Sequence, residues 1–165
     1  MNTRQLLAAL SVLAAAGCAS YGGSGLVPGR STAAEVESLM GAPDEKLGLA
    51  DGDSEWFYTR PQGRETFAVT LSPGGIVKSV EQRLTEQNLA RLRAGASTRQ
   101  DVRALLGPPE LVSRLSRQGR EVWQYAMRNA DQDDYFLYAQ FSDDGVLREL
   151  LMLRDVHNEV AGDKG

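Results

Sequence analysis

An internal repeat is the feature that most limits what this chain of 165 residues can fold into. Residues 28–43 recur as residues 94–109, at a constant spacing of 66 positions. Further matches follow in the same order, including a Trp-x-Tyr pair that begins at Trp56 and again at Trp123. Because self-similarity at a fixed period indicates a supersecondary unit used more than once, we expect two similar units.

Each repeat opens with the signals of a short helix. Thr32 is followed three positions later by Glu35, which is the spacing of a capping box. The second repeat has Thr98 and Asp101 in the same places. Apolar residues then recur on one helical face, and a glycine followed two positions later by a proline ends the pattern.

Three stretches with strand-like alternation follow each helix, separated by turn residues. They span 55–59, 65–71 and 76–82 in the first unit and 122–127, 135–141 and 146–153 in the second. Residues 86–92 have helical composition and add a helix between the units. The expected fold class is α+β, with two tandem units of a helix plus a three-stranded antiparallel meander and helices packed on one side of the sheet.

The amino terminus has the pattern of an export signal. Arg4 precedes an apolar run that ends at Gly17, which is too short for the roughly 20 residues of a spanning helix. Residues 15–18 resemble the lipobox of bacterial lipoproteins, which implies that Cys18 is lipidated and, with Ala19 after it, directed to an outer membrane. Ordinary secretion remains the alternative, because residues 14–16 also fit an A-x-A cleavage site.

The expected division of the chain follows from these patterns. It comprises a signal peptide at 1–17, a flexible tether at 18–25, units at 26–84 and 85–153, and a polar tail at 154–165. The net charge of -4 and the absence of a basic stripe make nucleic acid an unexpected partner.

The residue inventory predicts no catalytic, metal or cofactor site. The sequence contains one cysteine, Cys18, and one histidine, His157, which lies in the polar tail and is expected at the surface. Nucleophile-elbow, phosphate-loop and dinucleotide motifs are missing, and no small-molecule substrate is predicted. Asp131, Asp133 and Asp134 suggest a calcium loop, but Phe136 replaces its glycine, so a hairpin turn is the favoured interpretation.

The repeated opening Gly-x-Ser-Thr-x-x-x-Val-x-x-x-x-Gly-x-Pro and the Trp-x-Tyr strand resemble the BamE/SmpA/OmlA lipoprotein family over residues 26–153. The doubled unit is also similar to the architecture of the beta-lactamase inhibitory proteins. The first resemblance implies an outer-membrane lipoprotein on the periplasmic face, acting as a non-catalytic accessory of the barrel-assembly machinery or of envelope integrity. The second leaves open an inhibitor or regulator of a periplasmic enzyme.

Comparison of the two units indicates a candidate partner-binding surface. Positions that agree between paired strands are expected in the core, and positions that differ are expected to face outward. The outward set in the second unit is the more apolar, and it consists of Phe136, Tyr138, Leu147, Leu151 and Leu153. Such a patch predicts a contact with envelope proteins unless the first unit, the 86–92 helix or the tail covers it. Trp56 and Trp123 are expected in the cores, with a carbohydrate platform as the alternative.

Overall fold

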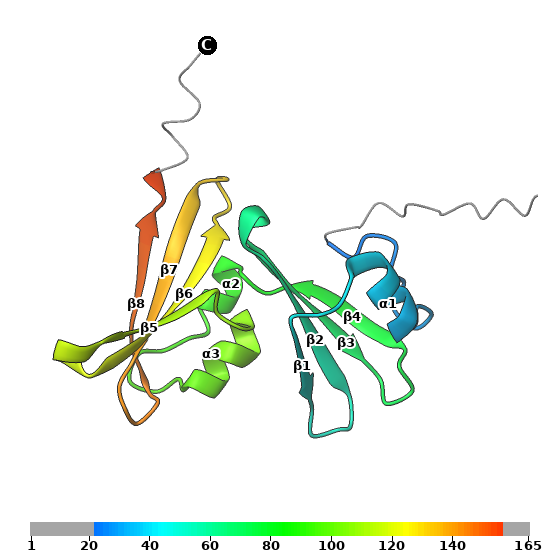
Figure 1. The fold of residues 1–165 in the computed structure, drawn as a ribbon, viewed down its shortest axis with the longest axis horizontal. Coiled ribbons are helices and arrows are strands. Elements are labelled where there is room, and N and C mark those ends of the chain that lie inside the picture. Colours follow the sequence, from blue (N-terminus) through cyan, green and yellow to red (C-terminus); the bar gives the residue numbers. More distant parts are fainter. Residues whose placement is uncertain (1–21, 157–165) are drawn as a thin grey trace, which may run out of the picture.

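Two antiparallel sheets of four strands form the structure, a computed structural model that describes residues 22–156. The first sheet has the order β1-β2-β3-β4 and the second β5-β6-β7-β8 (Figure 1). In chain order the helices and strands are α1 (Ala33–Met40), β1 (Glu45–Gly48), β2 (Ser54–Arg60), β3 (Glu65–Leu71), β4 (Val77–Gln82), α2 (Glu86–Leu89), α3 (Arg99–Leu106), β5 (Leu111–Leu115), β6 (Arg120–Arg128), β7 (Asp134–Phe141) and β8 (Leu147–Arg154). The α+β class is confirmed.

Cys18, His157 and the expected signal peptide lie outside the described residues. Within residues 22–156, none of the helices has the length and hydropathy needed to cross a membrane.

Each sheet has one strand more than the sequence predicted. β1 and β5 pair with the outer edges of β2 and β6, directly after the helix of their unit. All five residues of β5 are exposed, and β1 alternates between exposed and half-buried residues. Because neither strand buries a face completely, neither shows the apolar alternation on which the prediction relied. The prediction of three strands per unit is therefore wrong.

Both predicted capping boxes are present. Thr32 accepts a hydrogen bond from the Glu35 backbone N–H, and the Glu35 carboxylate accepts one from the Thr32 N–H at 2.7 Å. Thr98 and Asp101 repeat this arrangement, with the corresponding distance at 2.8 Å. These bonds satisfy backbone donors that the first turn of a helix leaves without partners.

We expect the capping boxes to lose their contribution to stability in acid. The backbone N–H of Thr32, and then its hydroxyl, lower the pKa of Glu35 from 4.5, and Thr98 lowers that of Asp101 from 3.8 in the same way. A carboxyl group whose pKa is lower in the folded state stabilises the fold at pH values above its unfolded-state pKa. This stabilisation is lost as the pH falls through the folded-state pKa. The double variant E35Q/D101N keeps a side-chain oxygen as hydrogen-bond acceptor in each capping box, but its amide groups do not titrate. Urea midpoints across the acid range should therefore fall less steeply for this variant than for the unmodified chain.

The helix of each unit is tied to the last strand of the same unit. Isolated bridges join Thr32 to Ile76 and Thr98 to Val146. The N–H of Val77 donates to the Ser31 carbonyl at 2.8 Å, and the N–H of Leu147 donates to the Ser97 carbonyl at 2.7 Å. The repeat found in the sequence is thus also a repeat of tertiary hydrogen bonds.

Each unit has its own apolar core between helix and sheet. In the first unit Val36 and Met40 of α1 pack with Trp56, and in the second Val102 and Leu106 of α3 pack with Trp123. Both tryptophans are buried, which confirms their assignment to the cores. Helix α2 is shorter than the predicted 86–92, but the segment around it fills the second core through Leu84, Leu89 and Leu92.

The first residues of the described chain pack against the first unit. Gly23, expected in a flexible tether at 18–25, is buried. A Cβ placed on it would lie 3.1 Å from Val80 and 3.2 Å from the Met40 sulfur. The described end of the expected tether is therefore fixed to the core of the first unit.

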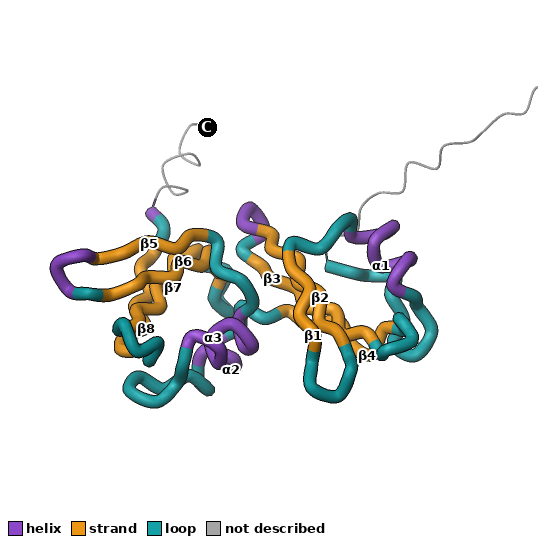
Figure 2. Tube along the Cα trace, turned by 60° about the horizontal axis from the view of Figure 1, so that its bottom comes forward, coloured by secondary structure: helices purple, strands orange, loops and turns teal. Residues whose placement is uncertain are grey.

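The second face of the first sheet is covered by the second unit. Phe57, Thr66 and Ala68 have no exposed surface, although they point away from the core beneath α1. Figures 1 and 2 show α2 and α3 lying between the two sheets, with α1 beyond the first sheet. A Cβ on Gly107, after α3, would lie 2.7 Å from Thr66 and 3.0 Å from Phe57. The Arg103 Nε also donates to the Glu45 carboxylate at 2.9 Å.

A buried ion-pair cluster is the second contact between the units. Arg64, in the turn between β2 and β3, has a left-handed backbone with φ 55 and a side chain that is only 8% exposed. Its Nε lies 3.0 Å from the Asp134 carboxylate, and its Nη1 donates to the Tyr135 carbonyl at 3.1 Å. The third guanidinium nitrogen, Nη2, pairs with Asp155. Arg64 thus joins the first unit to both β7 and the residue after β8.

Candidate partner-binding face

Four of the five predicted contact residues form one surface on β7 and β8. The register pairs Phe136 with Leu153 and Tyr138 with Leu151, so their side chains are neighbours on one side of the sheet. Leu151 and Leu153 are 38% and 48% exposed, whereas Phe136 and Tyr138 are half-buried. The centroids of the two rings are 6.4 Å apart.

Leu147 does not belong to this surface, and its predicted outward orientation is wrong. It has no exposed surface and packs in the second core beside Phe141. The ladder between β7 and β8 shifts after Gln140, because Gln140 pairs with Glu149 whereas Phe141 pairs with Leu147. Such a bulge inserts one extra residue and reverses the face of every residue on one side of it. The sequence comparison assumed uninterrupted alternation and could not detect it.

We expect thiol labelling to separate these two environments. In a Cys18→Ala background, Leu151→Cys should react with a water-soluble maleimide about as fast as an unfolded thiol. Leu147→Cys should react at least about 100-fold more slowly, because labelling of a core thiol requires local or global opening. Fast labelling of both positions in the folded protein would contradict the bulged register.

Strand β5, which the sequence did not predict, extends this apolar surface. Leu111 and Leu115 of β5 are 53% and 40% exposed and pair with Gln124 and Arg120 of β6. This pairing places them on the same side of the sheet as Tyr138, which is opposite Gln124. The sequence did not indicate these residues because β5 was not predicted. We call the set Leu111, Leu115, Phe136, Tyr138, Leu151 and Leu153 the β5–β8 apolar face.

Polar networks border the apolar face at both ends. At one end Arg120 donates to Gln140 at 2.9 Å and to Glu149 at 3.1 Å. At the other end Arg128 donates to Asp134 at 2.7 Å, beside the cluster around Arg64. An apolar centre with a satisfied polar border is the anatomy of a protein–protein contact.

The sequence left three segments that could cover the apolar face, and the structure shows where two of them lie. The first unit reaches the face at its border, where the Arg64 guanidinium lies 5.1 Å from the centroid of the Phe136 ring. The segment 86–92 packs in the core on the opposite side of the sheet through Leu89 and Leu92. Residues 157–165 of the tail lie outside the described residues. Leu111, Leu151 and Leu153 remain solvent-exposed in residues 22–156.

The other candidate features have structural explanations. Asn129 and Asp133 close the hairpin between β6 and β7, since the Asp133 N–H donates to the Asn129 side chain at 2.8 Å. Within residues 22–156 no group of three His, Cys, Asp or Glu side chains is placed to hold a metal ion.

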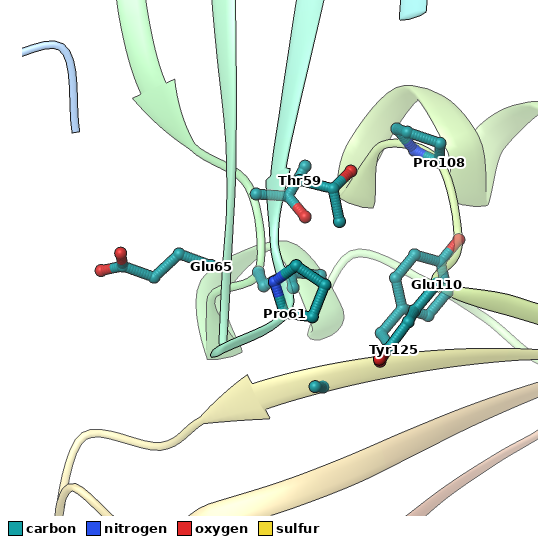
Figure 3. Close-up of a pocket in the computed structure, with 9 residues that line it drawn as sticks. Thr59, Pro61, Glu65, Pro108, Glu110 and Tyr125 are labelled. Atoms are coloured by element: carbon teal, nitrogen blue, oxygen red, sulfur yellow. The ribbon is translucent and has the colours of Figure 1, made fainter. Parts of the chain in front are cut away.

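A small cavity lies at the junction of the two units, with Thr59, Pro61 and Glu65 on one side and Pro108, Glu110 and Tyr125 on the other (Figure 3). It has room for about one water molecule. Burial raises the pKa of Tyr125, whose hydroxyl donates to the Gly107 carbonyl at 3.2 Å. The cavity is part of the contact between the units.

One comparison with known proteins supports the resemblance stated from the sequence. A search of curated proteins found no significant match. Among solved structures, a DUF4309 family protein (YjgB) from Bacillus subtilis is 17% identical, with 80% of this chain and 84% of that chain covered. Its TM-score of 0.32 is too low to support a conclusion. A family model described as "Outer membrane protein assembly factor BamE domain" matches residues 82–150. The second unit is therefore similar to the BamE domain, and the predicted family resemblance is confirmed there.

Proposed function

We propose that the protein is a non-catalytic accessory of outer-membrane protein assembly, anchored by a lipid on Cys18 to the periplasmic face of the outer membrane. The family match over residues 82–150 is the observation that best supports this function, since the family is described as an outer membrane protein assembly factor domain. The apolar face of the same unit provides a surface through which such an accessory would bind an envelope protein.

Affinity purification tests this proposal. The tagged full-length protein is cross-linked mildly, recovered from detergent-solubilised membranes, and compared with Cys18→Ala and with Leu151→Glu. We expect barrel-assembly subunits with the unmodified protein, less of them with Cys18→Ala, and loss of them with Leu151→Glu.

Two results would contradict the proposal. One is recovery of a single periplasmic enzyme, equally with the unmodified protein and Cys18→Ala, which would assign the protein to the inhibitors. The other is recovery of the same barrel-assembly subunits in equal amounts with every form, which would leave no role for the anchor or the face.

A further inference from the structure

The two sheets are equivalent, but within residues 22–156 only the first of them has both faces covered. Trp56 pairs with Val69, and Trp123 pairs with Ala139 at the corresponding positions, which fixes the equivalence of the strands. The face of the first sheet that contains Phe57 is covered by the helical end at Gly107. The equivalent face of the second sheet is the β5–β8 apolar face, which no described helix covers.

The chemistry of the two equivalent faces differs at four positions that are charged on the first sheet and apolar on the second. The first sheet has Glu45, Glu55, Glu81 and Arg83 on this face, and the second has Leu111, Val122, Leu151 and Leu153 in their places. On the first sheet these charges form ion pairs, such as Glu45 with Arg103 of the covering helix and Glu55 with Arg83. A cover for the second sheet would need apolar side chains at these places instead of charged ones.

The border of the apolar face lacks a net charge that would attract an anionic surface. Arg120 is paired with Glu149, Arg128 with Asp134, and Arg64 with Asp134 and Asp155. Binding to anionic lipid depends on unneutralised Lys and Arg side chains near the membrane. These pairs favour a protein as the occupant rather than a lipid surface.

We propose that the β5–β8 apolar face binds the apolar stripe of one amphipathic helix from a partner protein. The helix would cover the second sheet as the end of α3 covers the first sheet. This inference rests on the proposed function and deepens it, because it specifies which surface the accessory uses and which kind of element it recognises.

A second copy of the chain does not fit the same position. Its α1 would have to take the place of α3, but α1 has Glu37 where α3 has Arg103, and Glu37 already pairs with Lys46. Gly41 would then meet the ring of Phe136, where Gly107 meets the small side chain of Thr66. The equivalent contact between copies is therefore blocked by size and lacks the ion pair.

The test uses helical peptides displayed on a fixed scaffold and selected against the whole chain. Leu151→Glu and Leu111→Glu change opposite sides of the face. Met152→Glu is the matched control, because Met152 is 39% exposed on the same strand but pairs with Leu137 on the other side of the sheet. Thermal unfolding of each variant verifies that it folds.

We expect selected peptides to have apolar residues at the i, i+3, i+4 and i+7 positions of a helix. The best of them, as a free peptide, should bind at least about tenfold more weakly to Leu151→Glu and to Leu111→Glu, and equally to Met152→Glu.

Three results would overturn the inference. Peptides with alternating apolar residues that lose binding to Met152→Glu would indicate strand pairing at the edge of β8. Self-association of the chain that Leu151→Glu abolishes would make a second copy the occupant. Failure to select helical peptides, with Leu151-dependent binding to vesicles of phosphatidylethanolamine and phosphatidylglycerol, would make it a membrane. Each of these can occur while the affinity purification succeeds, so the inference and the proposed function can fail separately.

Discussion

Arg64→Ala should lower the free energy of unfolding by about 3–5 kcal/mol, because breaking a buried ion-pair cluster by removing one partner is strongly destabilising. Arg64 and Asp155 have side chains that are almost fully buried, and Asp134 is nearly so. The substitution also removes the hydrogen bond to the Tyr135 carbonyl. Urea unfolding of the full chain, followed by tryptophan fluorescence, measures the effect.

Arg114→Ala is the matched control for this prediction. Arg114 pairs with Asp143 within the second unit, and both side chains are exposed, so we expect a change of less than about 1 kcal/mol. Trp56 lies in one unit and Trp123 in the other, so separate transitions in Arg64→Ala would indicate that the units have uncoupled. An equal, small effect of both substitutions would show that the cluster does not hold the units together.

Gly107→Ala should cost about 3–5 kcal/mol, from strain in a backbone region that only glycine adopts easily and from overpacking against the other unit. Gly107 has φ 83, and its added Cβ would meet Thr66 and Phe57 at 3.0 Å or less. Gly41 provides the control, because it has φ 85 at the equivalent position with nothing within 4 Å of an added Cβ.

Gly41→Ala should therefore lower the free energy of unfolding through backbone strain alone, by about 1–3 kcal/mol. The difference between the two variants measures the contact between α3 and the first sheet. Equal losses in urea unfolding would mean that the units do not pack closely at Gly107.

Much of the fold could be predicted because the signals were local and occurred twice. The capping boxes, the glycine stops and the strands around Trp56 and Trp123 follow from short-range chemistry. Strands β1 and β5 could not be predicted, since neither edge strand buries a face completely and so neither has an apolar period.

The candidate site was predictable in part for the same reasons. Phe136, Tyr138, Leu151 and Leu153 share a face because β7 and the second half of β8 alternate regularly. Leu147 was misplaced by a bulge that depends on the pairing of two strands, and Leu111 was missed with its strand. The burial of the first sheet under α3 depends on contacts between the units, which the comparison of the two repeats does not contain.

The Arg64 cluster sets an order on the folding of a newly made chain. The hydrogen bonds that close the first unit join residues 31–33 to residues 75–77, so this unit can close before the second is complete. The partners of Arg64 at Tyr135 and Asp155 come 71 and 91 positions later. The cluster around Arg64 is incomplete until the ribosome has released Asp155, which follows the end of β8. The contact that Arg64 makes between the units is therefore completed only after the second sheet has been synthesised.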